Sequence, residues 1–98
     1  MGGVNKYETM FIIKPDLSDE DKKVLFNQIN DVVTKNQGTV SGGSVWSEKR
    51  KLYPPIKKCR EGMYYLLNFS ISPSSIKEIK HAYKLNEFIL RVLITKTE

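Results

Sequence analysis

The sequence predicts an α+β fold in which two helices cover one face of a four-stranded antiparallel sheet. Segments with strand or helix character follow one another in the order strand–helix–strand–strand–helix–strand. Each helical segment has a single apolar stripe and therefore one side to bury, which places both helices on the same sheet face. The length of 98 residues fits a single domain, spanning residues 1–98.

The first strand and the first helix follow from residue type and capping. Residues 7–14 are rich in aromatic and β-branched side chains and are followed by Pro15, which favours a strand. We expect a helix from Ser18 to about Asn36, because the Ser18 hydroxyl can accept a hydrogen bond from a free amide of the first turn. The apolar stripe of this helix consists of Leu25, Ile29, Val32 and Val33.

The second and third strands are expected to form a hairpin. The second strand covers residues 39–46, and two adjacent glycines within it predict a bulge or a bend. The third strand covers residues 63–71, with Tyr65 and Leu67 on one face and Tyr64 and Leu66 on the other. Between these strands lies a basic stretch, after which Glu61-Gly62 is predicted to reverse the chain.

The second helix, residues 73–85, and the last strand, residues 88–95, complete the pattern. Proline is well tolerated in the first turn of a helix, and Ile76, Ile79 and Tyr83 form one apolar stripe. In the last strand, Leu90, Val92 and Ile94 alternate with Arg91, Leu93 and Thr95. The complete order is that of the split βαβ, or ferredoxin-like, fold (βαββαβ), which leaves the second sheet face open.

Residues 49–60, here called the basic segment, account for the positive charge of the chain. The net charge is +5, whereas the residues outside this segment comprise 10 basic and 11 acidic side chains. A compact positive block attracts a dense negative polymer, so we expect contacts with RNA phosphates; the alternative is a solvated loop. The basic residues of the segment are Lys49, Arg50, Lys51, Lys57, Lys58 and Arg60.

The open sheet face is expected to have an apolar centre. A sheet face in water should be polar, so an apolar centre predicts a covering protein partner. RNA-recognition modules of this topology stack bases on the same face, and Tyr64 is a candidate for stacking, but their Gly-Phe-rich third-strand motif is missing. An ordinary scatter of exposed apolar side chains is the remaining alternative. The predicted partner-binding residues are Met10, Ile12, Tyr64, Leu66 and Leu93.

The sequence offers little for catalysis, so we predict that the protein is not an enzyme. His81 lies on the lysine-rich side of the second helix, and no histidine is near Cys59 in the sequence. We find no Cys/His metal spacing and no glycine-rich phosphate loop, and we expect no cofactor, metal or small-molecule substrate. An acyl-phosphate hydrolase of this fold would need an anion-cradling loop with a catalytic arginine and asparagine, which we do not find.

Two features that the sequence lacks indicate the cellular compartment of the protein. No run of 18 or more apolar residues occurs, which predicts no membrane span. The single cysteine cannot form an internal disulfide, which fits a reducing cytoplasm.

Several stretches together resemble a known family. They are YETMFIIKPDLS near the start, Gly38 before the second strand, KRKLYPPIKK, the Gly-Met-Tyr-Tyr that follows it, and LRVLITK at the end. In succession and spacing they resemble the bacterial-type ribosomal protein number six of the small subunit, over residues 7–96. The resemblance implies the same fold and a structural, ribosomal-RNA-binding role in translation. It places the protein in the central domain, or platform, of a cytoplasmic or organellar small subunit, together with ribosomal protein number eighteen. The alternative is a free-standing RNA-recognition-like regulator that binds single-stranded RNA.

By position, the resemblance implies RNA contacts by the basic end of the second strand, by Tyr7 and by Arg91. Two departures from the family concern aromatic residues. The family reads Leu-Ala-Tyr-Pro-Ile where this chain has Leu-Tyr-Pro-Pro-Ile, so Tyr53 is displaced by one position. Trp46 is followed by serine where the family has Trp-Gly, again one residue out of register. A shift of one residue moves a strand side chain to the opposite face unless a bulge compensates.

Overall fold

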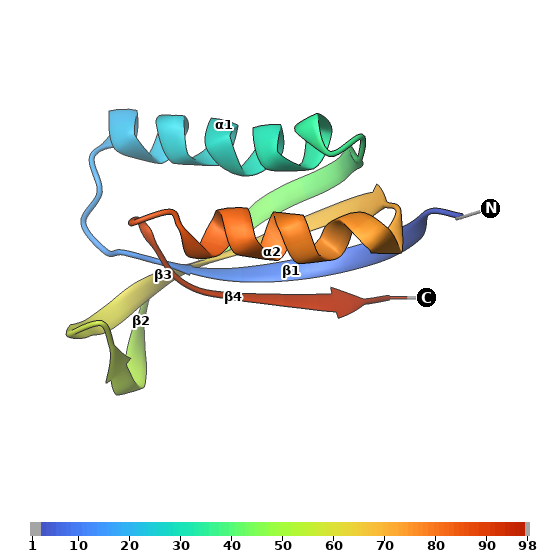
Figure 1. Ribbon diagram of the computed structural model, residues 1–98. Helices are drawn as coiled ribbons and strands as arrows, with labels where there is room; N and C mark the ends of the chain where they lie inside the picture. Colours follow the sequence, from blue (N-terminus) through green and yellow to red (C-terminus); the bar gives the residue numbers. More distant parts are fainter. Residues whose placement is uncertain (1–2, 98) are drawn as a thin grey trace.

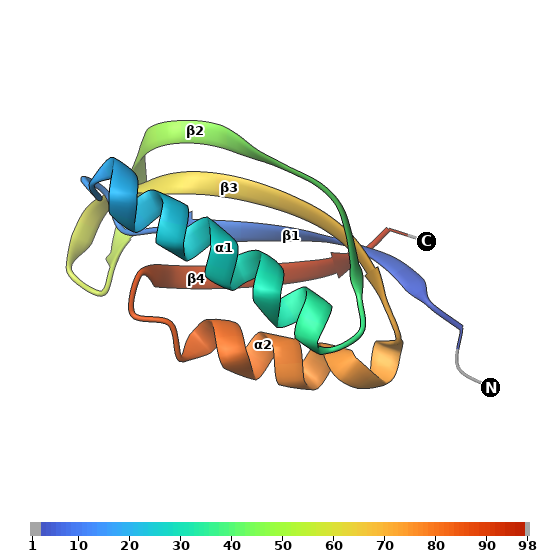
Figure 2. The same cartoon turned by 90° about the horizontal axis from the view of Figure 1, so that it is seen from above.

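The computed structural model describes residues 3–97 and confirms the predicted fold, with two helices on one face of a four-stranded antiparallel sheet (Figure 1). The strand order is β2-β3-β1-β4, so β1 and β3 are central and β2 and β4 form the edges (Figure 2). The elements are β1 (Asn5–Ile13), α1 (Asp19–Lys35), β2 (Thr39–Ile56), β3 (Cys59–Ile71), the 3-10 turn η1 (Pro73–Ser75), α2 (Ile76–Lys84) and β4 (Ile89–Lys96).

The ends of α1 follow the predicted capping. The Asp21 amide donates a hydrogen bond of 3.1 Å to the Ser18 hydroxyl, so Ser18 is the N-cap. At the other end the Gly38 amide donates to the Val33 carbonyl at 2.9 Å. Gly38 is needed here for space, because a Cβ would lie 2.7 Å from a methyl group of Val33. The start of the second helical segment differs from expectation, since Pro73–Ser75 forms a 3-10 turn before α2 begins.

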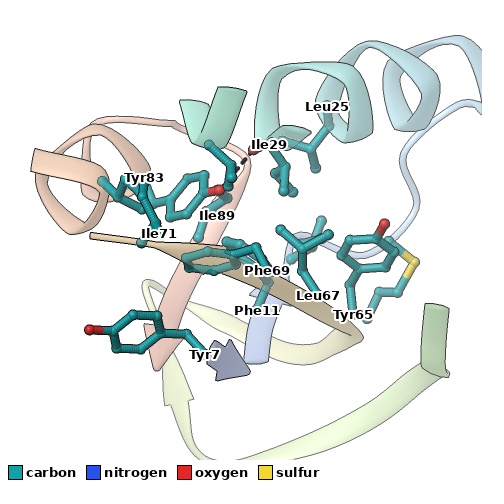
Figure 3. Packing of buried hydrophobic residues seen from close by; sticks show 14 residues of the cluster. Tyr7, Phe11, Leu25, Ile29, Tyr65, Leu67, Phe69, Ile71, Tyr83 and Ile89 are labelled. Carbon is teal, nitrogen blue, oxygen red and sulfur yellow. Dashed lines mark hydrogen bonds between the residues drawn. The ribbon is translucent and has the colours of Figure 1, made fainter. Parts of the chain in front are cut away.

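The main core lies between the sheet and the two helices (Figure 3). Phe11 of β1 and Leu67 of β3 are fully buried at its centre. The Phe11 ring meets the Tyr83 ring of α2 edge to face, with 4.8 Å between centroids. Both central strands therefore anchor the helices, while their opposite faces are free of helical cover.

The Tyr83 hydroxyl links the two helices, because it donates a 2.7 Å hydrogen bond to the Ile29 carbonyl of α1 (Figure 3). We expect Tyr83→Phe to lower the free energy of unfolding by about 1 kcal/mol at neutral pH, the usual net value of one buried hydrogen bond. Urea unfolding followed by circular dichroism measures this change. A variant as stable as the parent would show that this hydrogen bond makes no net contribution.

The same side chain makes stability depend on pH in the alkaline range. The pKa of Tyr83 is raised above its ordinary value by burial and, secondarily, by the neighbouring Tyr65, whose own pKa is raised by burial. Above pH of about 10 the unfolded chain releases phenolic protons that the folded chain keeps. The contribution of these phenolic groups to the free energy of unfolding is therefore fully present below that pH and is lost as the pH rises. We expect Tyr83→Phe to make this alkaline decline shallower, and an unchanged decline would contradict the assignment.

The hairpin between β2 and β3 turns earlier than the sequence predicts. The chain reverses at Lys57 and Lys58, which both have positive φ angles, of 48° and 68°. The predicted reversal at Glu61-Gly62 is wrong, because both residues lie within β3. The role of Gly62 is close packing, since a Cβ there would lie 2.8 Å from a methyl group of Ile12.

Irregular pairing curls this hairpin toward the open sheet face. The β2–β3 register shifts at four places, and bulges of this kind bend a strand and increase its twist. Figure 1 shows the hairpin end bent to the side of the sheet away from the helices. It forms a second small core in which Leu52 packs with Ile12 and Leu90.

This second core corrects two expectations. Ile12 was predicted to be open to a partner, but the hairpin covers it and leaves only 8% of it exposed. The predicted alternation in the last strand also breaks, because the β1–β4 register shifts between Ile12 and Ile13. Leu90 consequently packs in the small core, while Val92 and Ile94 pack against the main core.

Candidate nucleic-acid interface

The adjacent cations at the start of the basic segment separate to different sides of the hairpin. The Lys49 ammonium lies 3.6 Å from the Asp16 carboxylate, beside the loop that enters α1. Arg50 instead lies over aromatic rings of the open face. Lys49 and Arg50 therefore do not act as one cluster, although they are neighbours in the sequence.

Arg50 is held by two aromatic rings. Its guanidinium carbon lies 4.8 Å from the centroid of the Trp46 ring and 5.7 Å from that of Tyr64. The two rings meet each other at 5.6 Å with a 60° angle between their planes. Stacking of this kind orients a guanidinium while leaving its N–H groups available.

A bulge brings Trp46 to this position. Val45 pairs with Tyr65 and Ser47 pairs with Tyr64, so Trp46 is the extra residue between two consecutive pairs. The one-residue shift of Trp46 from the family pattern thus coincides with a bulge, and this bulge puts the Trp46 ring beside Tyr64. About half of the Trp46 surface, 52%, remains exposed.

A shallow groove continues this surface toward β4. Its volume is about 280 Å³, and Lys51, Tyr53, Tyr64 and Arg91 contribute to its walls above the small core. Tyr53 is 83% exposed, the most exposed aromatic side chain among the large apolar residues of the described chain. We call these cationic and aromatic residues together the hairpin surface: Trp46, Arg50, Lys51, Tyr53, Tyr64 and Arg91.

The other predicted RNA contacts of the basic segment lie near the tip of the hairpin. Lys58 is exposed at the turn, and Arg60 lines a neighbouring depression with Lys51 and Tyr53. Lys57 points toward the beginning of β4, where its ammonium lies 3.5 Å from the Ile89 carbonyl. These side chains extend the positive charge beyond the hairpin surface.

Tyr7 is separate from this region. Its ring packs on Phe69 at 5.8 Å, and only 7% of the residue is exposed. It pairs near the start of β1, whereas the hairpin curls over the opposite end at Ile12. The structure therefore gives the Tyr7 ring a packing role and no free face for stacking on a base.

The predicted apolar patch is smaller than expected, but the pairing of β1 with β3 and β4 brings its remaining residues together. Met10 pairs with Leu66 on one side and with Leu93 on the other, so these side chains lie in one row across the open face. Leu93 is 64% exposed, while Met10 and Leu66 are half-buried. We call this row the open patch; Tyr64 connects it with the hairpin surface.

Sequence reasoning identified the cations but did not group them with the aromatic residues. The available signal was the interleaving of Trp46 and Tyr53 with basic residues, a pattern typical of nucleic-acid surfaces. Within residues 3–97, no group of His, Cys, Asp and Glu is arranged to hold a metal ion. No helix in the same range is long and apolar enough to cross a membrane.

Comparison with known proteins gives a consistent result. The family described as Ribosomal protein S6 matches residues 6–96. The small ribosomal subunit protein bS6 of Caldanaerobacter subterraneus subsp. tengcongensis is 36% identical over 95 residues, covering 97% of this chain and 99% of that protein. The bS6 protein of Dictyoglomus turgidum is 39% identical over 95 residues, with 97% of each chain covered.

Solved structures share the fold. The 30S ribosomal protein S6 of Thermotoga maritima has a TM-score of 0.85 at 24% identity, covering 96% of this chain and 88% of that chain. The C-terminal domain of MgtC from Mycobacterium tuberculosis has a TM-score of 0.66 at 12% identity, covering 98% and 90%. These likenesses concern the fold, which by itself does not define a function. The sequence matches define the family: this chain belongs to the ribosomal protein S6 family and is a structural component of the small ribosomal subunit.

Proposed function

We propose that the hairpin surface binds ribosomal RNA in the central domain of the small subunit. The observation that supports this most strongly is the guanidinium of Arg50, which lies over the rings of Trp46 and Tyr64. A guanidinium placed in this way presents fixed N–H donors to phosphate oxygens. Exposed aromatic rings beside it offer faces on which unpaired bases stack.

The remaining cations support the same role through charge. Lys51 and Arg91 lie along the groove next to Tyr64, and Lys58 and Arg60 lie farther out along the hairpin. Phosphate contacts of this kind position a protein on RNA and make binding depend strongly on salt. They do not select one RNA site by themselves, which gives a second protein at the site a role in specificity.

We propose that the second protein is ribosomal protein number eighteen and that it covers the open patch. Met10, Leu66 and Leu93 have no helix above them, and Leu93 is largely exposed. Burial of this row would contribute about 25 cal/mol per Å² of apolar surface, offset by the ordering costs of association. Because Tyr64 connects the patch with the hairpin surface, RNA and the protein partner would meet along one continuous face.

Co-sedimentation tests the RNA role directly. The tagged protein is expected to migrate with small ribosomal subunits in a sucrose gradient and to protect central-domain RNA from chemical modification. A protein that binds single-stranded RNA but stays at the top of the gradient would support the alternative, a free-standing regulator.

The partner role is tested by Leu66→Asp. We expect this variant to lose binding to ribosomal protein number eighteen while keeping its fold, because Leu66 lies outside the main core. Asn68→Asp is the matched control: Asn68 is exposed two residues along the same strand and on the same face. Titration calorimetry with the purified partner measures both variants. Normal binding by a folded Leu66→Asp protein would exclude the open patch as the interface.

A further inference from the structure

The outer edge of β4 carries a second cationic site, which shares Arg91 with the hairpin surface but otherwise consists of different residues. Among residues 3–97, β4 pairs with β1 alone, so its other side is an edge with no pairing strand (Figure 2). At the start of this edge the Lys57 ammonium lies 3.5 Å from the Ile89 carbonyl. A groove of about 520 Å³ follows this edge from the first residues of β4 to Leu93. The charged residues described in its lining are all positive and come from three elements: Lys57 of the hairpin turn, Lys80 and Lys84 of α2, and Arg91 of β4.

The cations flank the strand edge on both sheet faces. Lys80 and Lys84 belong to α2, which runs beside β4 in the helical layer (Figure 2). Arg91 pairs with Ile12 of the open face, and the hairpin that carries Lys57 curls toward that same face. If an extended chain lay along β4, the side chains on each of its two faces would therefore lie near positive charge.

The floor of the groove is aliphatic. It consists of the β4 residues Ile89, Leu90, Val92 and Leu93, of which Leu93 is 64% exposed. No aromatic side chain lines the groove, in contrast to the hairpin surface. An aliphatic floor with a free strand edge suits an added β-strand, whereas stacking of nucleic-acid bases requires aromatic or planar faces.

We propose that this edge binds an extended acidic segment of another protein as a fifth strand. Backbone hydrogen bonds to β4 would supply affinity, and carboxylates on both faces of the added strand would pair with the flanking lysines and arginine. A second copy of this chain is disfavoured at the same edge, because pairing of two β4 strands would bring the cations of both copies together.

The probe for this proposal is a blocked peptide of repeated Glu-Glu-Val-Val, in which each face of an extended chain alternates acidic and apolar side chains. Peptides of repeated Gln-Gln-Val-Val and Lys-Lys-Val-Val are the uncharged and basic controls. Two-dimensional NMR of the full chain follows binding, and amide hydrogen exchange reports on the β4 edge. We expect binding of the acidic peptide alone, with new protection of alternate β4 amides that have no partner in β1.

Two pairs of charge-reversal variants distinguish binding at the β4 edge from nonspecific attraction between opposite charges. Lys80→Glu combined with Lys84→Glu should weaken peptide binding by about tenfold or more. Lys23→Glu combined with Lys35→Glu changes the net charge equally on the exposed surface of α1 and should leave binding unchanged. Circular dichroism checks that both pairs of variants are folded.

Four outcomes would overturn the proposal. Absence of binding would show that the cations only protect a free strand edge from aggregation. An equal loss of peptide affinity in the two pairs of variants would show nonspecific attraction between charges. Peptide-induced changes in NMR chemical shift that are confined to the hairpin would show the same. Equally strong displacement of the peptide by a single-stranded RNA of the same charge would assign the groove to phosphates instead.

Discussion

Phe11→Ala is expected to lower the free energy of unfolding by about 3–5 kcal/mol, the range for removing a buried phenylalanine ring. Phe11 is fully buried in the central strand β1 and pairs with Tyr65 on β3 and Val92 on β4. Its ring also meets the Tyr83 ring edge to face. The substitution therefore leaves a cavity where β1, its two neighbouring strands and α2 meet, and it removes an aromatic pair. Urea unfolding at neutral pH measures the change.

Phe88→Ala provides a control for this stability experiment. Phe88 precedes β4 and is only partly buried at the margin of the same core. We expect Phe88→Ala to lower the free energy of unfolding by less than Phe11→Ala, because it removes less buried apolar surface and leaves a smaller cavity. A larger loss for Phe88→Ala than for Phe11→Ala would contradict the description of the core.

Simultaneous reversal of charge at Arg50, Lys51 and Arg91 is expected to weaken binding to central-domain ribosomal RNA by about a hundredfold or more. All three side chains are exposed and belong to the hairpin surface. Each lost phosphate contact should also reduce the slope of the logarithm of affinity against the logarithm of salt concentration by about 0.7–0.9. Filter binding at several salt concentrations gives both quantities.

The control for this experiment carries the same change in net charge elsewhere. Lys23→Glu, Lys35→Glu and Lys77→Glu lie on exposed positions of the two helices, and none of these residues belongs to the hairpin surface. We expect a small loss of affinity and little change in salt slope. An equal effect of the two triple variants would mean that net charge governs binding and that the hairpin surface has no special role.

The elements of the fold could be predicted from the sequence because each carries a local signal. The Ser18 cap, the apolar stripes of both helices and the alternation in β1 were sufficient for the architecture and for the row of Met10, Leu66 and Leu93. Such signals depend on hydrogen bonds and side-chain directions within a few residues.

The candidate site could be predicted only in part, because bulges interrupt the alternation from which faces are assigned. The bulge at Trp46 places its ring beside Tyr64, and the shift beside Ile12 turns Leu90 to the open face. The position of Ile12 under Leu52 depends on the curl of the whole hairpin. These features follow from tertiary packing, which overrides a strict period of two residues.

Directed cleavage from the hairpin tests most directly whether this surface faces ribosomal RNA. An iron chelate is tethered through Tyr53→Cys in a Cys59→Ser background, because Tyr53 is highly exposed and Cys59 is the single native cysteine. The comparison probe is tethered through Lys23→Cys on the exposed face of α1 in the same background. In assembled small subunits we expect strong, discrete cleavage of central-domain RNA from the hairpin probe and weak cleavage from the helix probe. Equal cleavage from both positions, or stronger cleavage from α1, would contradict the assignment of RNA binding to the hairpin surface.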